Sequence, residues 1–320
     1  MKTLFCLLAA ACAVVFPPRA CAAPAKQDDV AREFLWQQFR ELPADARPRV
    51  GVALSGGGAK GFAHVGVLQI LSDAGFPVDC LAGTSMGSVV GSMYCAGLPF
   101  EKIWEIGGAA SFAKVSGDYN AVGMLELVLS QKLFSSEKME SFVNSYMGGK
   151  TFDQLKIPFS CSAMDLKTGE NIVFREGPVA IAVRASMNIP GLFSPVQYRQ
   201  RYLVDGGVAD FLPVQSARDM GADWVLASVT LGDYSAAKFH SILSYVMQVM
   251  DIRGAILAEA AMKKADFVVE PHVSDISFVE LNRCPQAGER GVLAMNENIA
   301  SAEESLIFFS INEIASQYNK

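Results

Sequence analysis

The sequence predicts an α/β protein, a three-layer α/β/α sandwich around a mostly parallel central sheet. From residue 49 onward, short apolar segments of strand length alternate with longer segments whose apolar residues recur at helical spacing. The first of these segments, Val50 to Leu54, is apolar throughout, which is typical of a strand that helices cover on both faces. No internal repeat or linker-like segment interrupts residues 49–300. We therefore expect one domain rather than two.

In chain order, the first strand is expected at 50–54, followed by a helix over 59–74 that stops at Gly75. A strand at 79–82 runs directly into a helix over 86–96, which Gly97 and Pro99 end. Residues 100–150 have helical spacing interrupted by glycines. Further strands are expected at 159–164, 171–174, 201–204, 224–230 and 267–269, and further helices at 241–264 and 303–317. Residues 49–320 then form one domain, with a core at 49–230 and a helical C-terminal part at 231–320.

The N-terminus has the pattern of a secretory signal peptide. Lys2 precedes an apolar run from Leu4 to Phe16, and small residues follow around Ala22. The run is too short to span a bilayer. We expect residues 1–22 to be a signal peptide and 23–48 an N-terminal extension with a short helix over 30–40. The protein is then exported, either periplasmic or secreted, with membrane association left open.

Charge and cysteine content exclude several classes of function. The chain has a net charge of −6, and removal of residues 1–22 leaves 25 basic and 33 acidic residues, a net charge of −8. An acidic chain lacks the basic surface of a nucleic-acid binder. Four cysteines remain, too few and too widely spaced for a disulfide framework, although the sequence does not decide whether they pair: Cys80, Cys95, Cys161 and Cys284. Since metal-ligand spacing is absent, no metal site is expected.

The first motif that indicates catalysis is Gly83-Thr84-Ser85-Met86-Gly87, between an expected strand and an expected helix. A sharp strand-to-helix turn presents a serine hydroxyl at the sheet edge, and the flanking glycines remove side chains that would clash there. The serine also lies at a helix N-terminus, where the dipole favours negative charge. Ser85 is therefore the candidate nucleophile, with Gly83 and Gly87 shaping the turn.

A second glycine-rich segment follows the first strand: Gly56, Gly57, Gly58, Ala59, Lys60 and Gly61. Its backbone N–H groups can point at the oxyanion of a tetrahedral intermediate. The segment also matches the dinucleotide-binding pattern G-x-G-x-x-G, which expects an acidic residue at the end of the next strand. Asp79 instead lies at the start of that strand, and Ser85 follows its end. We therefore favour an oxyanion hole over a nucleotide site.

A candidate base follows the strand at 201–204. Asp205 precedes Gly206 and Gly207, which would let its carboxylate approach another loop closely. A serine hydroxyl needs a neighbouring base to become a good nucleophile. Histidine is the usual base, and the order Ser85, Asp205, His272 also matches an α/β-hydrolase triad, so that alternative stays open.

The other two histidines of the mature chain are His64 and His240. His64 falls on the buried or half-buried face of the first helix, where a histidine is more typical of a core than of a catalytic site.

Together these segments resemble the patatin-like phospholipase family. The resemblance covers about residues 49–230 and rests on four ordered blocks: GVALSGGGAKGFAHVGVL at 51–68, GTSMGS at 83–88, ASMNIPGLFSPV at 185–196 and LVDGGVADFLPV at 203–214. A looser likeness continues to about residue 294. No motif departs from the family pattern, although the signal peptide and the lack of a following barrel or accessory domain differ from its commonest bacterial form.

The resemblance implies a patatin-like α/β/α sandwich that hydrolyses ester bonds of phospholipids or other acyl lipids through an acyl-enzyme. In this family Ser85 would be the nucleophile and Asp205 the general base, without a catalytic histidine. The N–H groups around Gly57, Gly58 and Ala59 would form the oxyanion hole, with Lys60 beside it. No cofactor or metal is implied; the partner is an acyl lipid with peripheral membrane contact. An acyltransferase relative would require a histidine where Thr84 stands, and the oligomeric state stays open.

The segment 107–134 is the candidate path for lipid. It contains four charged residues among many apolar ones, and glycines interrupt any continuous helix. One interpretation is a pair of core helices with loops. The other is an apolar cover over the active site that contacts lipid without charge attraction.

Overall fold

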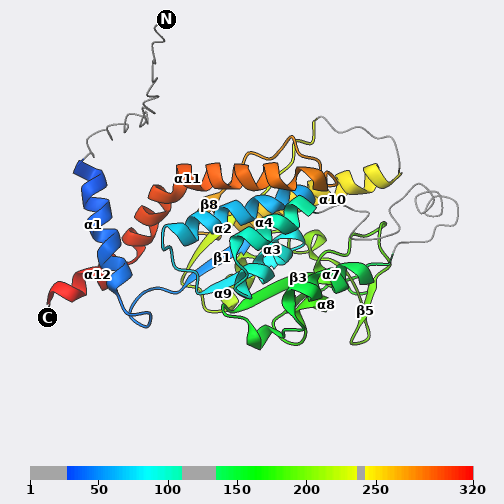
Figure 1. The fold of residues 1–320 in the computed structure, drawn as a ribbon, viewed down its shortest axis with the longest axis horizontal. Helices are drawn as coiled ribbons and strands as arrows, with labels where there is room; N and C mark the ends of the chain where they lie inside the picture. Colours follow the sequence, from blue (N-terminus) through cyan, green and yellow to red (C-terminus); the bar gives the residue numbers. More distant parts are fainter. Residues whose placement is uncertain (1–26, 110–134, 236–241, 320) are drawn as a thin grey trace, which may run out of the picture.

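The computed structural model describes residues 27–109, 135–235 and 242–319 (Figure 1). The expected signal peptide at 1–22, the part of the candidate lipid path from residue 110 to 134, and His240 lie outside these residues. Among the helices that are described, none is both long and apolar enough to cross a membrane.

The centre of the molecule is a mixed sheet in the order β5-β6-β3-β2-β1-β7-β8, with β4 paired to β3 off this path. The strands β3, β2, β1, β7 and β8 run parallel to their neighbours in that order. β4, β5 and β6 are joined by antiparallel pairing. The strands are β1 (Val50–Leu54), β2 (Cys80–Thr84), β3 (Phe159–Asp165), β4 (Asn171–Phe174), β5 (Val196–Tyr198), β6 (Arg201–Asp205), β7 (Trp224–Ser228) and β8 (Phe267–Val269).

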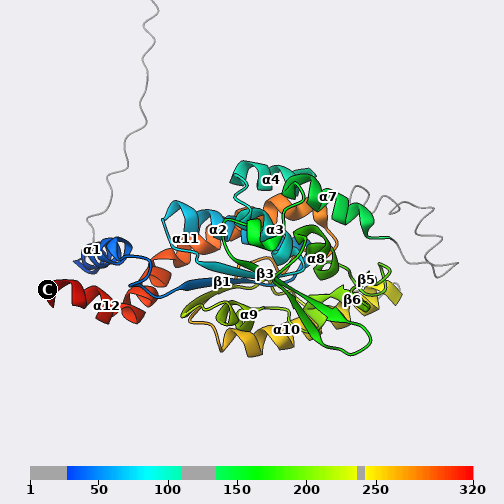
Figure 2. The same cartoon turned by 90° about the horizontal axis from the view of Figure 1, so that it is seen from below.

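Helices cover both faces of this sheet (Figure 2). One face carries α2 (Ala63–Asp73), α3 (Met86–Cys95), α4 (Phe100–Ala109), α7 (Glu137–Met147), α8 (Val179–Ser186) and α11 (Cys284–Phe309). The other face carries α9 (Val214–Asp219) and α10 (Ile242–Met262). The predicted three-layer α/β/α sandwich with a mostly parallel sheet is confirmed.

Strand β1 shows why a central strand of this sheet can be apolar throughout. Val52 and Leu54 pack into the core beneath α2, α3 and α11, whereas Ala53 packs into the core on the side of α9 and α10. All five residues of β1 are buried. Because both faces of a central parallel strand are covered, no alternation between polar and apolar residues is needed.

The short helix expected over 30–40 is α1 (Gln27–Glu41), and it packs on the main core. Trp36 and Phe39 are buried, and the Trp36 ring lies 5.2 Å from that of Phe39 and 5.3 Å from that of Phe76. At this end of the molecule α1 lies beside α12 (Ile311–Ser316) and the end of α11 (Figure 1).

The helix predicted over 303–317 begins too late in the sequence. The structure has the longer helix α11 from Cys284 to Phe309, followed by α12. Gly288 and Gly291 weaken the helical signal, because glycine is a poor helix former. They are required by packing instead: a side chain at Gly291 would contact the backbone of Ala63 in α2, and one at Gly288 the Trp104 ring. The sequence also missed α8, α9 and β5.

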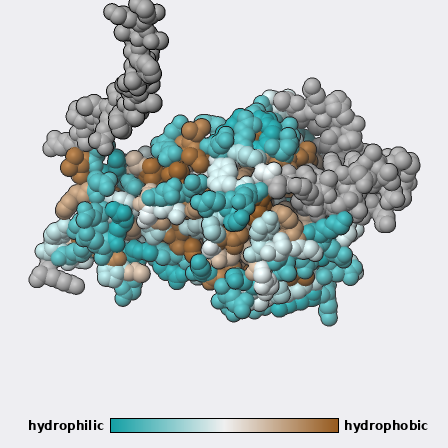
Figure 3. Space-filling view, in the orientation of Figure 1, coloured by the Kyte–Doolittle hydropathy of each residue, from teal (hydrophilic) through white to brown (hydrophobic). Residues whose placement is uncertain are grey.

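The described surface over α2, α4 and α11 is mixed in character. Figure 3 shows hydrophilic residues over most of this face, with apolar residues in smaller patches between them.

Strand β3 brings two distant parts of the chain together. β4 pairs with residues 161–164 on one edge of β3. On the other edge, β2 pairs with residues 159–162 and β6 with residues 163–165. β2 runs parallel to β3 and β6 antiparallel, so their carboxyl ends meet: Thr84 lies opposite Ser162, and Asp205 opposite Ala163. This junction is where Ser85 and Asp205 leave the sheet.

Candidate active site

Ser85 occupies the turn between β2 and α3 in a strained conformation, with φ 51° and ψ −121°. A positive φ at a residue with a side chain costs about 1–3 kcal/mol and occurs mainly at functional sites. The flanking glycines allow the tight turn. A Cβ at Gly83 would lie 2.5 Å from the Gly87 oxygen, and a Cβ at Gly87 would lie 2.5 Å from the Leu54 oxygen. Any side chain at Gly83 or Gly87 would therefore collide with the backbone, and the turn at Ser85 needs glycine at both positions.

The Ser85 hydroxyl donates a hydrogen bond directly to Asp205, with 2.7 Å between Oγ and Oδ2. The other carboxylate oxygen of Asp205 accepts the Gly207 N–H at 2.7 Å. Gly206 must be small because a Cβ there would contact the backbone oxygen of Ser162. The structure therefore brings the predicted serine and aspartate into contact and uses both glycines that follow the aspartate.

Burial raises the pKa of Asp205 from 3.8 to about 6, even though the hydrogen bonds from Ser85 and Gly207 act in the opposite direction. Removal from water disfavours the charged carboxylate. A carboxylate with this pKa is ionised at neutral pH and is a stronger base than an exposed one. It can accept a proton from the hydroxyl that it contacts.

The glycine-rich loop lies beside this pair. Gly56 N–H donates to the Phe211 oxygen at 2.9 Å, and Ala59 N–H donates to the Phe278 oxygen at 2.9 Å. Within the described part of the chain, neither Gly57 N–H nor Gly58 N–H has a backbone acceptor. Of the three N–H groups expected to form an oxyanion hole, two thus lack a backbone partner, whereas that of Ala59 is engaged.

The remaining two residues of the loop have other contacts. Lys60 is buried, and its Nζ lies 3.1 Å from Asp251 Oδ2 of α10, so its charge is paired inside the protein. A Cβ at Gly61 would lie 2.7 Å from Met86 Cβ, the residue after Ser85. The loop therefore packs between α10 and the start of α3.

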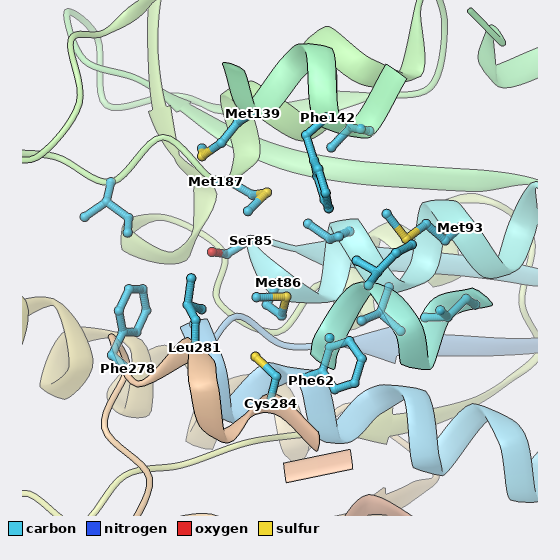
Figure 4. A pocket seen from close by; sticks show the side chains of 18 of the residues that line it. Phe62, Ser85, Met86, Met93, Met139, Phe142, Met187, Phe278, Leu281 and Cys284 are labelled. Carbon is cyan, nitrogen blue, oxygen red and sulfur yellow. The ribbon is translucent and has the colours of Figure 1, made fainter. Parts of the chain in front are cut away.

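A narrow apolar cavity with a volume of about 70 Å³ opens at Ser85 (Figure 4). Met86, Val89, Val90 and Met93 of α3 form one wall, which runs along two turns of that helix away from Ser85. The remaining lining is also apolar apart from the Cys284 thiol: Gly58, Phe62, Ile103, Ile106, Gly107, Met139, Phe142, Val143, Met187, Ile189, Phe193, Phe278 and Leu281. The lining is thus apolar, with Ser85 at one end of it.

A second, smaller pocket of about 20 Å³ lies on the other side of Ser85 and contains Asp205. Met247, Met250 and Asp251 of α10 line it together with Phe211, the glycine loop and Gly207. Ser85 and Phe278 line both pockets.

Comparison with known proteins shows the family of this chain. The family model described as "Patatin-like phospholipase" matches residues 52–218, more than half of the chain. The chain belongs to the patatin-like phospholipase family.

An uncharacterised NTE family protein of Mycobacterium tuberculosis is 36% identical over 181 residues, 56% of this chain and 48% of the relative. Lysophospholipase NTE1 of Debaryomyces hansenii is 32% identical over 179 residues, 56% of this chain and 11% of the relative. The chain thus spans at most about half the length of these relatives. Among solved structures, VipD from Legionella pneumophila is 13% identical, with a TM-score of 0.48, over 80% of this chain and 67% of that one.

In this patatin-like domain the alternative dinucleotide site finds no support at Asp79. Its carboxylate accepts hydrogen bonds from Arg47 at 2.6 and 2.8 Å and from Val50 N–H at 2.7 Å. Asp79 therefore links the N-terminal ends of β1 and β2, whereas the glycine-rich loop follows the C-terminal end of β1.

Of the histidines that the structure describes, neither His64 nor His272 is hydrogen-bonded to Ser85. His64 is buried and bonds Ser228 Oγ at 2.8 Å and the Ser55 oxygen at 3.0 Å, as expected for a core histidine. Burial lowers its pKa to about 4. His272 has an exposed side chain, and its backbone oxygen accepts a hydrogen bond from Arg290. The Ser85 hydroxyl is instead occupied by Asp205.

The four cysteines of the described domain are free, buried thiols. Burial raises the pKa of Cys80 to about 11 and that of Cys284 to about 12, so both thiols stay protonated at neutral pH. No group of three or more potential metal ligands comes together among the residues described.

Sequence reasoning missed three residues at this site. Ser186 Oγ accepts the Ser85 N–H at 2.9 Å, and its position in the block at 185–196 was a signal that could have pointed to it. Asp251, which pairs with Lys60, and Phe278, which accepts the Ala59 N–H, stand outside every motif. Only the tertiary structure places them.

Proposed function

We propose that this protein is a serine acyl hydrolase that cleaves ester bonds of phospholipids or related acyl lipids through a Ser85–Asp205 dyad. The observation that carries the proposal is the 2.7 Å hydrogen bond from Ser85 Oγ to Asp205 Oδ2 at the mouth of an apolar cavity. Membership of the patatin-like phospholipase family supports the same chemistry.

In the first half of the reaction, Ser85 Oγ attacks the ester carbonyl while its proton passes to Asp205. The C–O bond to the leaving alcohol then breaks, and that alcohol takes the proton from Asp205. The ester carbonyl carbon remains bonded to Ser85 as an acyl-enzyme. The raised pKa of Asp205, about 6, suits a group that must accept and then return a proton near neutral pH.

In the second half, water attacks the acyl-enzyme and gives its proton to Asp205. The C–O bond to Ser85 breaks, the fatty acid leaves, and the proton returns to Ser85. Each half passes through a tetrahedral oxyanion. The N–H groups of Gly57 and Gly58 are the donors that we assign to this charge, because neither has a backbone acceptor within the described residues.

The substrate class follows from the two pockets. The apolar cavity along α3 would hold the acyl chain, since its lining offers no charged group. The smaller pocket beside Asp205, under α10, would hold the carbonyl-proximal part of the leaving alcohol. An acyl lipid has to leave a membrane or micelle to enter, so we also propose peripheral contact with lipid.

The experiment is product analysis on a mixed panel of phospholipids, lysophospholipids and acylglycerols with four proteins. Wild type should release fatty acids, whereas Ser85→Ala and Asp205→Asn should each lose nearly all of that release while remaining folded. His272→Ala is the matched control for the alternative triad and should retain most activity. A folded His272→Ala variant as inactive as Ser85→Ala would replace the dyad with a triad.

A further inference from the structure

A buried polar network lies next to the glycine-rich loop, and none of its four residues lines either pocket. It consists of Ser55, which follows β1, His64 of α2, Ser228, the last residue of β7, and Thr230, two residues after that strand. All four side chains are fully buried. Buried polar groups that a fold retains must be satisfied by partners, so each proton in the network can be traced.

The His64 ring determines the first proton positions. Its Nε2 lies 3.0 Å from the Ser55 carbonyl oxygen, which can only accept, so Nε2 carries the proton. Nδ1 therefore accepts the Ser228 hydroxyl at 2.8 Å. The imidazole is neutral, in agreement with the pKa of about 4 that burial gives it. His64 thereby fixes the carbonyl of Ser55, one residue before the loop.

The other protons converge on a single oxygen. The Thr230 backbone N–H donates to Ser55 Oγ at 3.0 Å, which directs the Ser55 hydroxyl proton onward to the Gly56 oxygen at 2.8 Å. The Thr230 hydroxyl donates to the same Gly56 oxygen at 2.9 Å. Two hydroxyls from different strand ends thus hold one carbonyl.

The consequence for the loop follows from peptide geometry. No peptide bond here is cis, so the Gly56 C=O and the Gly57 N–H of the same planar unit point in opposite directions. Holding the carbonyl toward Ser55 and Thr230 turns the Gly57 N–H away from them, and Gly57 lines the same pocket as Ser85. The Thr230 hydroxyl is so close that a side chain at Gly57 would collide with it.

We propose that Thr230 is a positioning residue, whose hydroxyl, together with that of Ser55, locks the Gly56–Gly57 peptide so that the Gly57 N–H serves as an oxyanion donor. The inference rests on the proposed hydrolase function. Thr230 contacts no substrate and acts through the backbone of the loop.

The test compares Thr230→Val, which removes the hydroxyl and keeps the branched shape, with Thr230→Ser, which keeps the hydroxyl. On a short soluble nitrophenyl ester, Thr230→Val should lower kcat by about tenfold or more with little change in KM, because a misdirected donor is lost mainly in the transition state. Thr230→Ser should restore most of kcat. Ser92→Ala is the matched control: Ser92 is also a fully buried hydroxyl that donates to a backbone oxygen, but in α3. It should leave kcat unchanged.

A second readout separates positioning from general damage. A trifluoromethyl ketone with the same acyl chain adds to the serine and places an oxyanion in the loop. In Thr230→Val its inhibition constant should increase by the same factor by which kcat/KM decreases. In Thr230→Ser the inhibition constant should return close to the wild-type value. If Thr230→Val does not fold, the same comparison is made with Ser55→Ala, which removes the other hydroxyl from the Gly56 oxygen.

Two results would overturn the proposal. One is a folded Thr230→Val enzyme with wild-type kcat and inhibitor affinity. The other is a loss of kcat without a matching loss of inhibitor affinity. Wild type and Ser85→Ala are measured in the same assay: if they do not differ, the hydrolase function itself fails and the positioning role falls with it.

Discussion

Replacing Asp205 by asparagine should make the protein inactive and, at neutral pH, more stable. The carboxyl is buried at the end of β6, and its pKa is raised from 3.8 to about 6. A carboxyl whose pKa is higher in the folded state stabilises that state only while it is protonated. As the pH rises from about 4 to about 6, the unfolded chain gives up this proton before the folded one does, so the free energy of unfolding decreases.

The size of the effect follows from the two pKa values. One pKa unit corresponds to about 1.4 kcal/mol, so the difference between 3.8 and about 6 amounts to about 3 kcal/mol once the pH is above 6. Asparagine does not titrate in this range. The stability of Asp205→Asn minus that of wild type should therefore rise by about 2 kcal/mol between pH 4 and pH 7, because the unfolded chain has already begun to lose this proton at pH 4.

The measurement is urea unfolding of both proteins, followed by circular dichroism at several pH values from 4 to 8. Other groups titrate equally in both proteins and cancel in the difference. Asp79→Asn is a control with the opposite sign: burial favours a higher pKa there, but the hydrogen bonds from Arg47 and from Val50 N–H outweigh it and lower the pKa of Asp79. If the difference in the free energy of unfolding between Asp205→Asn and wild type does not change with pH, the claim that burial of this carboxylate costs stability is refuted.

Three further predictions concern activity, specificity and export. The kcat/KM for a soluble ester should rise with pH up to about 6 and then level off, as Asp205 becomes the ionised base; a profile that is flat from pH 4 to 8 would exclude this base. Met93→Trp should fill the cavity two turns from Ser85 and shift the preference to shorter acyl chains, as measured on an ester series; equal loss at every length would mean general damage. The mature protein should begin near residues 23–26, and N-terminal sequencing of the native protein that returns Met1 would contradict export.

The central elements could be predicted because their signals are local. Apolar strands of about five residues, helical spacing between them and glycines at the turns are properties of short windows of sequence. The elbow at Ser85 is local as well: Gly83 and Gly87 are needed because the chain folds tightly onto itself there. The first half of helix α11 was not predicted, because Gly288 and Gly291 are there to let α11 pack closely against α2 and α4. A short window of sequence contains no information about those neighbouring helices.

The sequence by itself determined an α/β fold and placed Ser85, the glycine-rich loop and Asp205 each at a strand end. Only the tertiary structure decided that the serine and the aspartate touch. Because β6 could run in either direction, its position in the sequence did not tell at which end of the sheet Asp205 lies. In the structure β2 and β6 pair with the same side of β3, one after the other and in opposite directions, so that the C-terminal ends of β2 and β6 meet. The pairing of Lys60 with Asp251, the contact of Phe278 with the loop and the convergence of Ser55 and Thr230 on one carbonyl likewise join residues that are far apart in the chain. Such contacts depend on the order and direction of the strands, which local propensity does not encode.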